Sequence, residues 1–126
     1  MKKVTGIGGV FFKAQDPEKL KVWYQQHLGI ECNEYGAADF QWRVADAPDR
    51  TGKTVWSPCP HDTHHFDPSK QPFMINYRVA NLNALLAELR RAGVPVDDRI
   101  EEYEYGRLAW LMDPEGNRIE LWEPAE

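Results

Sequence analysis

GVFFKAQDPEKLKVWYQQHLGI, residues 9–30, and MINYRVANLNALLAELRRAGV, residues 74–94, are two versions of one pattern. When the segments are aligned, Asp16 of the first falls on Asn81 of the second. Each begins with an extended apolar stretch and continues with apolar residues three and four positions apart, which predicts a strand followed by a helix. Self-similarity on this scale indicates a chain built from two copies of one supersecondary unit.

The first predicted helix is marked at both ends. The Asp16 carboxylate can accept hydrogen bonds from the first backbone amides, and Pro17 suits the first helical position because its missing N–H costs nothing there. Gly29 suits the left-handed residue that follows a helix. Between these signals, side chains recur at helical spacing: Leu20, Trp23, Tyr24 and His27 or Leu28.

The second predicted helix has the same signals. Asn81 is its capping residue, and Gly93 matches Gly29 after a gap of one residue. The apolar stripe between them is regular and predicts an amphipathic helix with one buried face. It consists of Leu82, Leu85, Leu86 and Leu89.

The two copies also end alike. KTVWSPCP (53–60) aligns with IELWEPAE (119–126), so that Trp56 falls on Trp122. Each is preceded by a segment with an early proline and a later glycine, which is typical of hairpin turns; these are APDRTG (47–52) and DPEGN (113–117). Two more strands fit between each helix and its last strand, at about 30–35, 38–45, 96–103 and 105–112.

Each copy therefore predicts a strand, a helix and three strands. We expect one domain over residues 1–126, divided into a first module at about 4–58, a connecting loop at about 58–71 and a second module at about 72–124. A chain of 126 residues is the size of one ordinary domain.

Composition limits the partners and the compartment. The net charge of −5 argues against nucleic acid and membrane surfaces as partners, since both are polyanionic. The apolar start is short and lacks a signal-peptide cleavage site, and no segment reaches the roughly 20 apolar residues that span a bilayer. Cys32 and Cys59 show no disulfide spacing, so we expect reduced thiols and a cytoplasmic protein.

Alternation along the predicted strands separates two faces of the sheet. The set expected beneath the helices is Val10, Phe12, Ala14, Ile75, Tyr77, Val79, Ile119 and Leu121. The set expected on the opposite face is Gly9, Phe11, Lys13, Thr54, Trp56, Met74, Asn76, Arg78, Arg118, Glu120 and Trp122. A face that mixes aromatic, amide and charged side chains is typical of a small-molecule pocket. The alternative is a face that packs against its twin or another subunit.

The whole chain resembles the vicinal oxygen chelate superfamily, which includes glyoxalase I, bleomycin-resistance proteins, fosfomycin-resistance enzymes and extradiol dioxygenases. The likeness rests on DPEKLKVWYQQHLGI (16–30) in the first module and GRLAWLMDPEGNRIELWEP (106–124) at the end of the second. It implies an α+β fold in which two tandem βαβββ modules form a curled, cup-shaped mixed sheet with the helices on its outer face.

The resemblance also assigns four metal-ligand positions, on the first and last strand of each module, which are usually His and Glu in the family. The two positions on the first strands lie seven residues before each helix cap and are occupied by Gly9 and Met74. The two positions on the last strands are occupied by Thr54 and Glu120. Glycine has no ligand atom and a thioether binds Zn, Ni, Mn or Fe(II) poorly, whereas a catalytic metal needs about three protein ligands.

The resemblance therefore implies no bound metal or other cofactor. It favours the bleomycin-resistance branch, whose members bind a ligand without metal, often as homodimers with pockets at the interface. The side chains expected to contact a small organic ligand are Phe11, Thr54, Trp56, Asn76, Arg78, Arg107, Arg118 and Trp122. The aromatic members fit stacking walls for a flat ligand or packing in a dimer interface, and both interpretations stay open.

Glu120 has two interpretations. As a buried carboxylate it is a candidate general base or a partner for a cationic ligand group. Alternatively it forms an ion pair with Arg78, Arg107 or Arg118. These alternatives separate three functions: a metal-free binding protein, which we favour; a lyase, isomerase or dioxygenase-like enzyme using Glu120 as base or residual metal ligand; and a structural module whose cup is filled by its own side chains.

CPHDTHHFDP (59–68) contains three of the four histidines and resembles a metal site at first sight. Its Cys-x-His-x₂-His-His spacing matches no standard zinc pattern, and the adjacent His64 and His65 point apart in an extended segment. Its prolines indicate turns. We expect this stretch to be a loop that rims the cup or contacts a second subunit, and we assign no function to His27.

Overall fold

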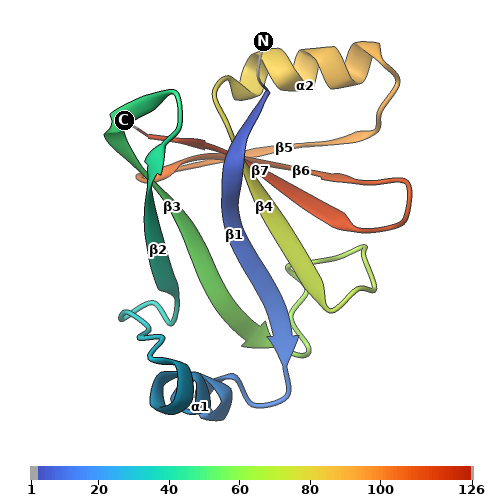
Figure 1. The fold of residues 1–126 in the computed structure, drawn as a ribbon. Helices are drawn as coiled ribbons and strands as arrows, with labels where there is room; N and C mark the ends of the chain where they lie inside the picture. The colour runs from blue at the N-terminus through green and yellow to red at the C-terminus, as the bar shows by residue number, and fades with distance from the viewer. Residues whose placement is uncertain (1–2, 126) are drawn as a thin grey trace.

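The computed structural model describes residues 3–125. Along the chain, the elements are β1 (Val4–Ala14), α1 (Pro17–Leu28), β2 (Ala38–Val44), β3 (Ala47–Pro60), β4 (Phe73–Val79), α2 (Leu82–Arg91), β5 (Val96–Tyr103), β6 (Gly106–Met112) and β7 (Arg118–Pro124). The strands form one mixed sheet in the order β2-β3-β1-β4-β7-β6-β5, and α1 and α2 lie at opposite ends of the molecule (Figure 1). The predicted α+β class is confirmed.

The sheet reproduces the repeat seen in the sequence. In each copy the first strand pairs in parallel with the last, β1 with β3 and β4 with β7. The two first strands, β1 and β4, then pair antiparallel at the centre and join the copies into one sheet. The two modules are thus joined through equivalent strands, the first strand of each.

Both helices begin and end where the sequence predicted. The Asp16 carboxylate accepts a hydrogen bond from the backbone N–H of Lys19 at 3.1 Å, and the Asn81 side chain accepts one from Ala84 at 3.0 Å. After α1, Gly29 adopts a left-handed conformation with φ of 71°, which closes the last turn without a Cβ penalty. These contacts confirm the predicted caps.

The strand predicted at about 30–35 is wrong, because this segment forms a turn. The Asn33 side chain accepts hydrogen bonds from the backbone N–H groups of Tyr35 and Ala37, and Gly36 donates its N–H to the Asn33 carbonyl. An Asn side chain that satisfies nearby backbone amides competes with strand pairing. The first copy therefore has one strand fewer than the second, and β2 becomes an edge of the sheet.

The turn predicted at 47–52 is also wrong, since these residues belong to β3. The chain reverses before them, and Val44 pairs with Ala47 across a two-residue connection. The register shifts between Arg43 and Val44, a bulge that interrupts the ladder where Pro48 cannot donate a hydrogen bond. The turn predicted at 113–117 is confirmed, with Asp113 accepting hydrogen bonds from Glu115 and Asn117.

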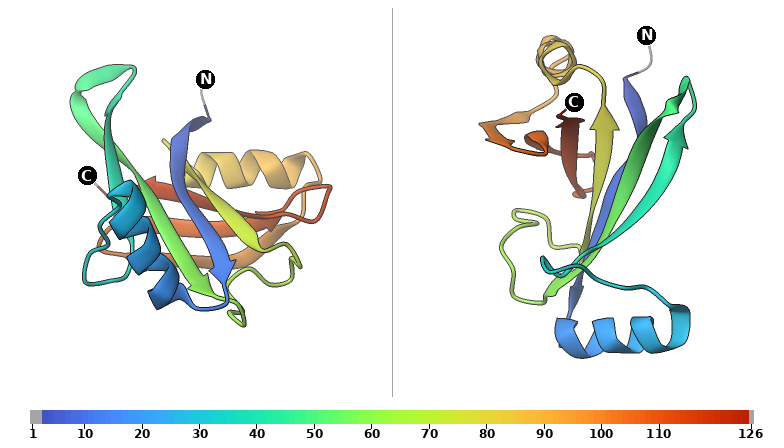
Figure 2. Two further views of the ribbon diagram at one scale, coloured as in Figure 1. Left: turned by 60° about the horizontal axis from the view of Figure 1, so that its bottom comes forward. Right: turned by 90° about the vertical axis from the view of Figure 1, so that its left-hand side faces the viewer.

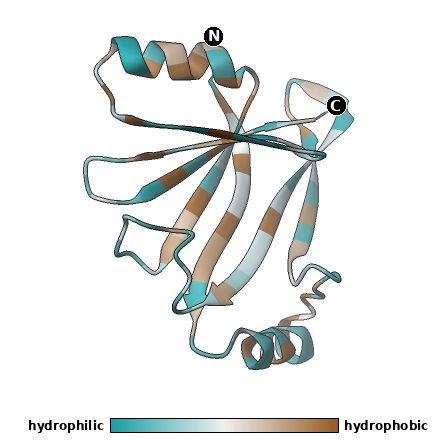
Figure 3. Cartoon of the chain, turned by 180° about the vertical axis from the view of Figure 1, so that it is seen from behind, coloured by the Kyte–Doolittle hydropathy of each residue, from teal (hydrophilic) through white to brown (hydrophobic). Residues whose placement is uncertain are grey.

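Two apolar clusters occupy the two faces of the sheet. The first lies beneath α2 and consists of Val79, Leu82, Leu85, Leu86, Ala109, Leu111 and Leu121, with Tyr77 and Ile119 packed against it. The second lies on the other face and consists of Phe66, Met74, Leu108, Trp110 and Trp122, with Phe11 and Cys59 at its margin. Figure 3 shows apolar and polar residues alternating along the strands, as the pattern predicted.

The predicted connecting loop occupies residues 61–72, between β3 and β4. It lies on the same side of β4 as strands β5–β7 (Figure 2, right). Phe66, at its middle, has no exposed surface and is part of the second apolar cluster. Ser69 ties the loop to the β6–β7 turn by donating its hydroxyl to the Gly116 carbonyl at 2.7 Å. The loop is therefore anchored over the face opposite the helices.

Within residues 3–125, no helix is long and apolar enough to cross a bilayer.

Candidate functional site

Glu120 lies at the centre of the face opposite the helices and is only 3% exposed. Its Oε1 accepts a hydrogen bond from Nδ2 of Asn76 at 2.7 Å, and its Oε2 accepts one from Nε1 of Trp110 at 2.8 Å. Both donors are its ladder partners, on β4 and β6. Burying a charge is costly unless hydrogen bonds replace its hydration, and each carboxylate oxygen here has such a bond.

Glu120 sets the orientation of the Asn76 amide, whose buried Oδ1 has no hydrogen-bond partner among residues 3–125. The amide Nδ2 faces the Glu120 carboxylate, so Oδ1 points the other way, toward Gly8. A Cβ built at Gly8 would clash with this oxygen. The glycine on β1 therefore makes room for the amide that binds Glu120.

His65, from the connecting loop, extends the cluster toward solvent. Its Nε2 lies 3.4 Å from Oε2 of Glu120, and its side chain is 45% exposed. The ring of Phe11 meets the imidazole edge-on, with centroids 6.3 Å apart. His65 thus links a buried carboxylate to the surface, an arrangement that suits binding of a polar group or transfer of a proton.

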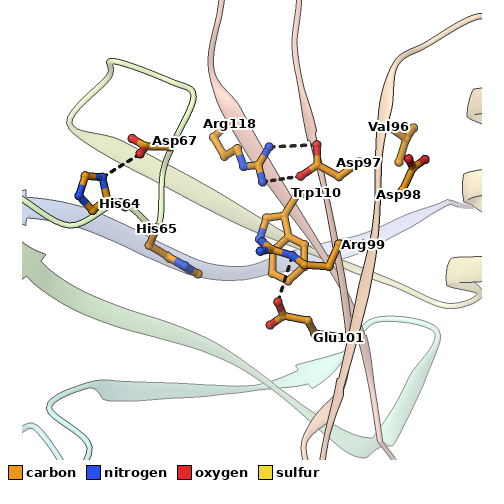
Figure 4. A pocket seen from close by; sticks show the side chains of 10 residues that line it. All are labelled: His64, His65, Asp67, Val96, Asp97, Asp98, Arg99, Glu101, Trp110 and Arg118. Atoms are coloured by element: carbon orange, nitrogen blue, oxygen red, sulfur yellow. Dashed lines mark hydrogen bonds and ion pairs between the residues drawn. The ribbon is translucent and has the colours of Figure 1, made fainter.

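A cavity of about 750 Å³ opens beside this cluster. The connecting loop supplies one wall, including His64 and His65, and strands β5–β7 supply the other, including Arg99, Trp110 and Arg118 (Figure 4). We call this space the Glu120 cavity after the neighbouring carboxylate, which does not itself line it but contacts His65 and Trp110 of its walls. The sequence left open whether this histidine stretch rims the pocket, and the structure places two of its histidines in the cavity wall.

The walls of the Glu120 cavity carry charges of both signs. Buried Arg118 donates two hydrogen bonds to Asp97, at 2.7 and 3.3 Å. Arg99 forms an ion pair with Glu101 at 3.0 Å, and its guanidinium lies 4.5 Å from the ring centroid of Trp110. Fixed donors and acceptors around an aromatic surface fit a small polar organic molecule.

The structure confirms the predicted side of the sheet for most of the candidate residues. Asn76 pairs with Glu120 and Arg78 with Trp122 across the β4–β7 ladder, and ladder partners share a face. The residues brought together on this face are Phe11, Met74, Asn76, Arg78, Arg118, Glu120 and Trp122.

Trp56 was predicted on this face, and that prediction is wrong. Trp56 pairs with Val10 in the β1–β3 ladder and lies under α1, where its ring contacts Phe12 and Tyr24 at centroid distances of 5.5 and 4.8 Å. The error came from aligning the similar ends of the two copies on Trp56 and Trp122, which have opposite orientations. Trp56 serves as packing for the first helix.

Arg107 and Thr54 are engaged elsewhere. The Arg107 guanidinium donates to Asn83 on α2 at 3.0 Å, on the opposite face to Trp110. The Thr54 hydroxyl donates to the Ile7 carbonyl at 2.6 Å and accepts from Nε1 of Trp42 at 2.9 Å. Neither residue lines the Glu120 cavity.

The alternative that Glu120 pairs with an arginine is also wrong for this structure. Within residues 3–125, Arg118 pairs with Asp97 and Arg107 with Glu102, while Arg78 lies between the rings of Trp42 and Trp122. The partners of Glu120 are instead Asn76, Trp110 and His65.

The strand register corrects one of the four metal positions implied by the resemblance, the one on the last strand of the first module. Phe11 pairs with Ser57 as Asn76 pairs with Glu120, so Ser57 is the counterpart of Glu120 in the first module and Thr54 is not. The positions then carry Gly9, Ser57, buried Met74 and Glu120. Both Glu120 oxygens already accept N–H bonds, so this donor set does not fit a transition metal.

The described part of the chain, residues 3–125, has no cluster of three or more His, Cys, Asp or Glu side chains able to hold a metal ion. That the protein binds no metal, as expected from the sequence, stays a prediction.

The sequence reasoning missed several residues, among them Trp110, Arg99 and Asp97 in the Glu120 cavity and Trp42 beside Arg78. Trp110 lies two residues after Leu108 in the predicted strand 105–112, so the period of two puts both on one face, and Trp110 pairs with Glu120 there. Trp42 lies in the predicted strand 38–45 but gave no signal of its position next to Arg78. Arg99 precedes its partner Glu101 on β5, where the sequence shows only a charged strand.

Comparison with known proteins shows which family this sequence matches. A family model described as Glyoxalase/Bleomycin resistance protein/Dioxygenase superfamily matches residues 6–121. Among curated proteins, no sequence matches the chain.

Solved structures with the same fold include several methylmalonyl-CoA epimerases. The Mycobacterium tuberculosis enzyme is 22% identical with a TM-score of 0.60, and the match covers 100% of this chain and 92% of that one. A Streptomyces coelicolor epimerase variant in complex with 2-nitronate-propionyl-CoA is 20% identical with a TM-score of 0.68, covering 98% and 99%. These similarities establish the shared fold.

Proposed function

Since the chain belongs to the Glyoxalase/Bleomycin resistance protein/Dioxygenase superfamily, we propose that it is a small-molecule-binding member that holds no metal at the family site. The ligand binds in the Glu120 cavity, against the aromatic face of Trp110 and the charged groups of β5. The observation that carries this proposal is the state of Glu120, whose two oxygens accept hydrogen bonds from Asn76 and Trp110.

A carboxylate that already accepts two hydrogen bonds is better suited to binding an organic ligand than to coordinating a metal ion. A metal would have to break two charge-assisted hydrogen bonds, which are the stronger class of protein hydrogen bond, and would gain one protein ligand. A neutral or cationic ligand group can instead reach the carboxylate through His65, which is half-exposed at the cavity. The ion pairs of the wall favour a ligand with both donor and acceptor groups.

A ligand screen tests this proposal. Thermal shift against a library of polar metabolites selects compounds, and titration calorimetry then measures their affinity for the wild type, His65→Ala and His61→Ala. His61 is exposed in the same loop and does not line the cavity, so it is the matched control. We expect at least tenfold weaker binding in His65→Ala, about 1.4 kcal/mol, and no change in His61→Ala. Ligands that bind equally well to both variants and to Arg99→Ala would place the site elsewhere.

The metal-free part of the proposal has a separate test. Protein purified without a tag and never exposed to chelator is analysed for Zn, Ni, Mn and Fe. We expect less than stoichiometric metal in the wild type and no difference in Glu120→Gln. One metal ion per chain that is lost in Glu120→Gln contradicts the proposal.

A second candidate function is favoured by the contact between His65 and Glu120 at 3.4 Å. An imidazole beside a carboxylate at a cavity wall is suited to moving a proton, as a lyase or isomerase requires. Incubation in D₂O with thioesters such as methylmalonyl-CoA, followed by NMR, detects exchange of the proton next to the carbonyl. Exchange that Glu120→Gln abolishes while binding persists supports an enzyme, and absence of exchange across the panel rejects it.

We further propose that the protein forms a homodimer through α1. This helix has no buried residue, and Val22, Trp23 and Leu28 are each at least half exposed. Apolar side chains gathered on one surface helix are typical of an interface. Analytical ultracentrifugation of the wild type and of Trp23→Glu tests this. We expect a dimer that dissociates in the variant, and a wild-type monomer at high concentration contradicts it.

A further inference from the structure

A second cavity, of about 730 Å³, lies between the β2–β3 hairpin and the end of β7. Among the described residues it shares no lining residue with the Glu120 cavity. Its central side chains are Trp42, Arg78, Tyr105 and Trp122, and we call it the indole groove. It therefore constitutes a site separate from the one proposed above.

The groove holds an arginine between two indole rings. The guanidinium carbon of Arg78 lies 5.2 Å from the ring centroid of Trp42 and 5.0 Å from that of Trp122. Cation–π attraction of this kind fixes the plane and position of the guanidinium. Arg78 is thus held ready to present its remaining donors to a ligand.

The indole rings are themselves fixed by hydrogen bonds that leave no polar atom for a ligand. Nε1 of Trp42 donates to Thr54 at 2.9 Å, and Nε1 of Trp122 donates to the Tyr105 carbonyl at 2.9 Å. Trp42 lies directly over Gly6 and Gly52, where any Cβ would meet its ring. The sequence thus provides a flat seat for one indole, and what the rings offer a ligand is apolar surface.

The positive charge of the groove is not neutralised at Arg78. Within residues 3–125, Arg78 forms no ion pair, and its Nε is buried without a hydrogen-bond partner. Burial, and secondarily the nearby Arg50, lower the pKa of Arg78. Lys53 lines the same groove and forms an ion pair with Asp39 at 3.8 Å. Of its two glutamates, Glu123 accepts the backbone N–H of Leu82 at 2.8 Å and Glu104 is exposed.

We propose that the indole groove binds a small aromatic carboxylate, whose carboxylate pairs with Arg78 and whose ring lies against Trp42 and Tyr105. A carboxylate matches the planar fork of a guanidinium and supplies the counter-charge that Arg78 lacks among residues 3–125. Tyr105 is exposed at the mouth of the groove and extends the aromatic surface toward solvent. A flat apolar group there gains contact area at little entropic cost.

Three probes separate the contributions of charge and ring: 2-naphthoate, the neutral 2-naphthamide and the aliphatic butanoate. Tryptophan fluorescence and titration calorimetry measure their binding to the wild type. We expect 2-naphthoate to bind and each of the other two to bind at least tenfold more weakly, because each lacks one half of the recognised group. Failure of 2-naphthoate to bind at millimolar concentration overturns the proposal.

Variants locate the binding. Arg78→Met should weaken 2-naphthoate at least tenfold, and Arg91→Met, an exposed arginine at the end of α2, should not. If Arg78→Met does not fold, Arg78→Lys keeps the charge but loses the fork and should also weaken binding. His65→Ala should leave 2-naphthoate binding unchanged. Binding that His65→Ala abolishes while the Arg78 variants retain it would assign the probe to the Glu120 cavity and reject the indole groove.

Discussion

Trp110 and Glu120 face each other across the β6–β7 ladder, and the indole N–H donates to the carboxylate at 2.8 Å. The same indole carries the Arg99 guanidinium on its ring. One aromatic residue thus satisfies a buried charge on one side and forms cavity wall on the other. Stability and ligand binding therefore depend on the same side chain.

Trp110→Phe should destabilise the protein, because it leaves Oε2 of Glu120 without its buried donor. Losing one partner of a buried, charged hydrogen bond costs about 1–3 kcal/mol. Urea unfolding measures the difference from the wild type. Tyr35→Phe is the control, because that ring is 85% exposed and surface changes cost within about 0.5 kcal/mol. Equal losses in the two variants would contradict the role given to the hydrogen bond.

Phe66→Ala should cost about 3–5 kcal/mol, the range for removing a large buried aromatic side chain. The ring has no exposed surface and connects the loop to Met74 and Trp110. Phe40→Ala, on the exposed side of β2, gives the matched comparison. Chemical unfolding of the two variants is sufficient, and a small effect at Phe66 would show that the loop is not anchored as described.

Asp113 makes the β6–β7 turn dependent on pH. Hydrogen bonds from Asn117, and then from Glu115, hold the pKa of this carboxyl below its usual 3.8. Since the folded pKa is the lower one, the stabilisation is complete above pH 3.8 and is lost as the pH falls through the folded value. Wild type should exceed Asp113→Asn in stability at pH 6, and the gap should close in acid.

Unfolding of both proteins from pH 6 to pH 2.5 checks this, since every other carboxyl is common to them and cancels. Glu115→Gln, in the same turn, serves as the control. A gap that stays constant through the acid range would refute the linkage to Asp113.

Cys59 should react slowly with iodoacetamide at neutral pH. Burial, reinforced by the negative charge of Glu120, raises the pKa of its thiol above 9.0, and only the thiolate is nucleophilic. Cys32→Ser isolates Cys59, and the rate is measured against pH in buffer and in urea. We expect the native protein to require higher pH than the unfolded chain. Coincident profiles would show that Cys59 is not shielded.

Local signals predicted the helices well, because caps and apolar stripes act over a few residues. Asp16 and Asn81 cap as expected, and the leucine stripe of α2 lies on the sheet. The strand predicted after α1 was wrong because the hydrogen bonds of the Asn33 side chain determine the conformation of that segment. The turn predicted at 47–52 was wrong because the chain already reverses between Val44 and Ala47, next to a bulge. The position of a bulge depends on the partner strand.

The candidate site was predictable only where alternation along a strand applies. Asn76, Glu120 and Trp122 follow from the period of two, and so does Trp110. The orientation of Trp56 depends on how β3 aligns with β1, which is a tertiary property. The contact between His65 and Glu120 joins residues 55 positions apart through an irregular loop, and no periodicity encodes such a contact.

The loss of one strand in the first module has a consequence for the whole sheet, because it leaves β2 as an open border. Such a border displays unpaired backbone groups that another chain can join. Here Asp39, Gln41 and Arg43 are all exposed along it. A row made of an acid, an amide and a base discourages a neighbouring strand from adding on. The shortened copy thus carries its own protection against edge-to-edge aggregation at β2, whereas the equivalent strand of the second copy, β6, is paired on both sides and the edge there is β5.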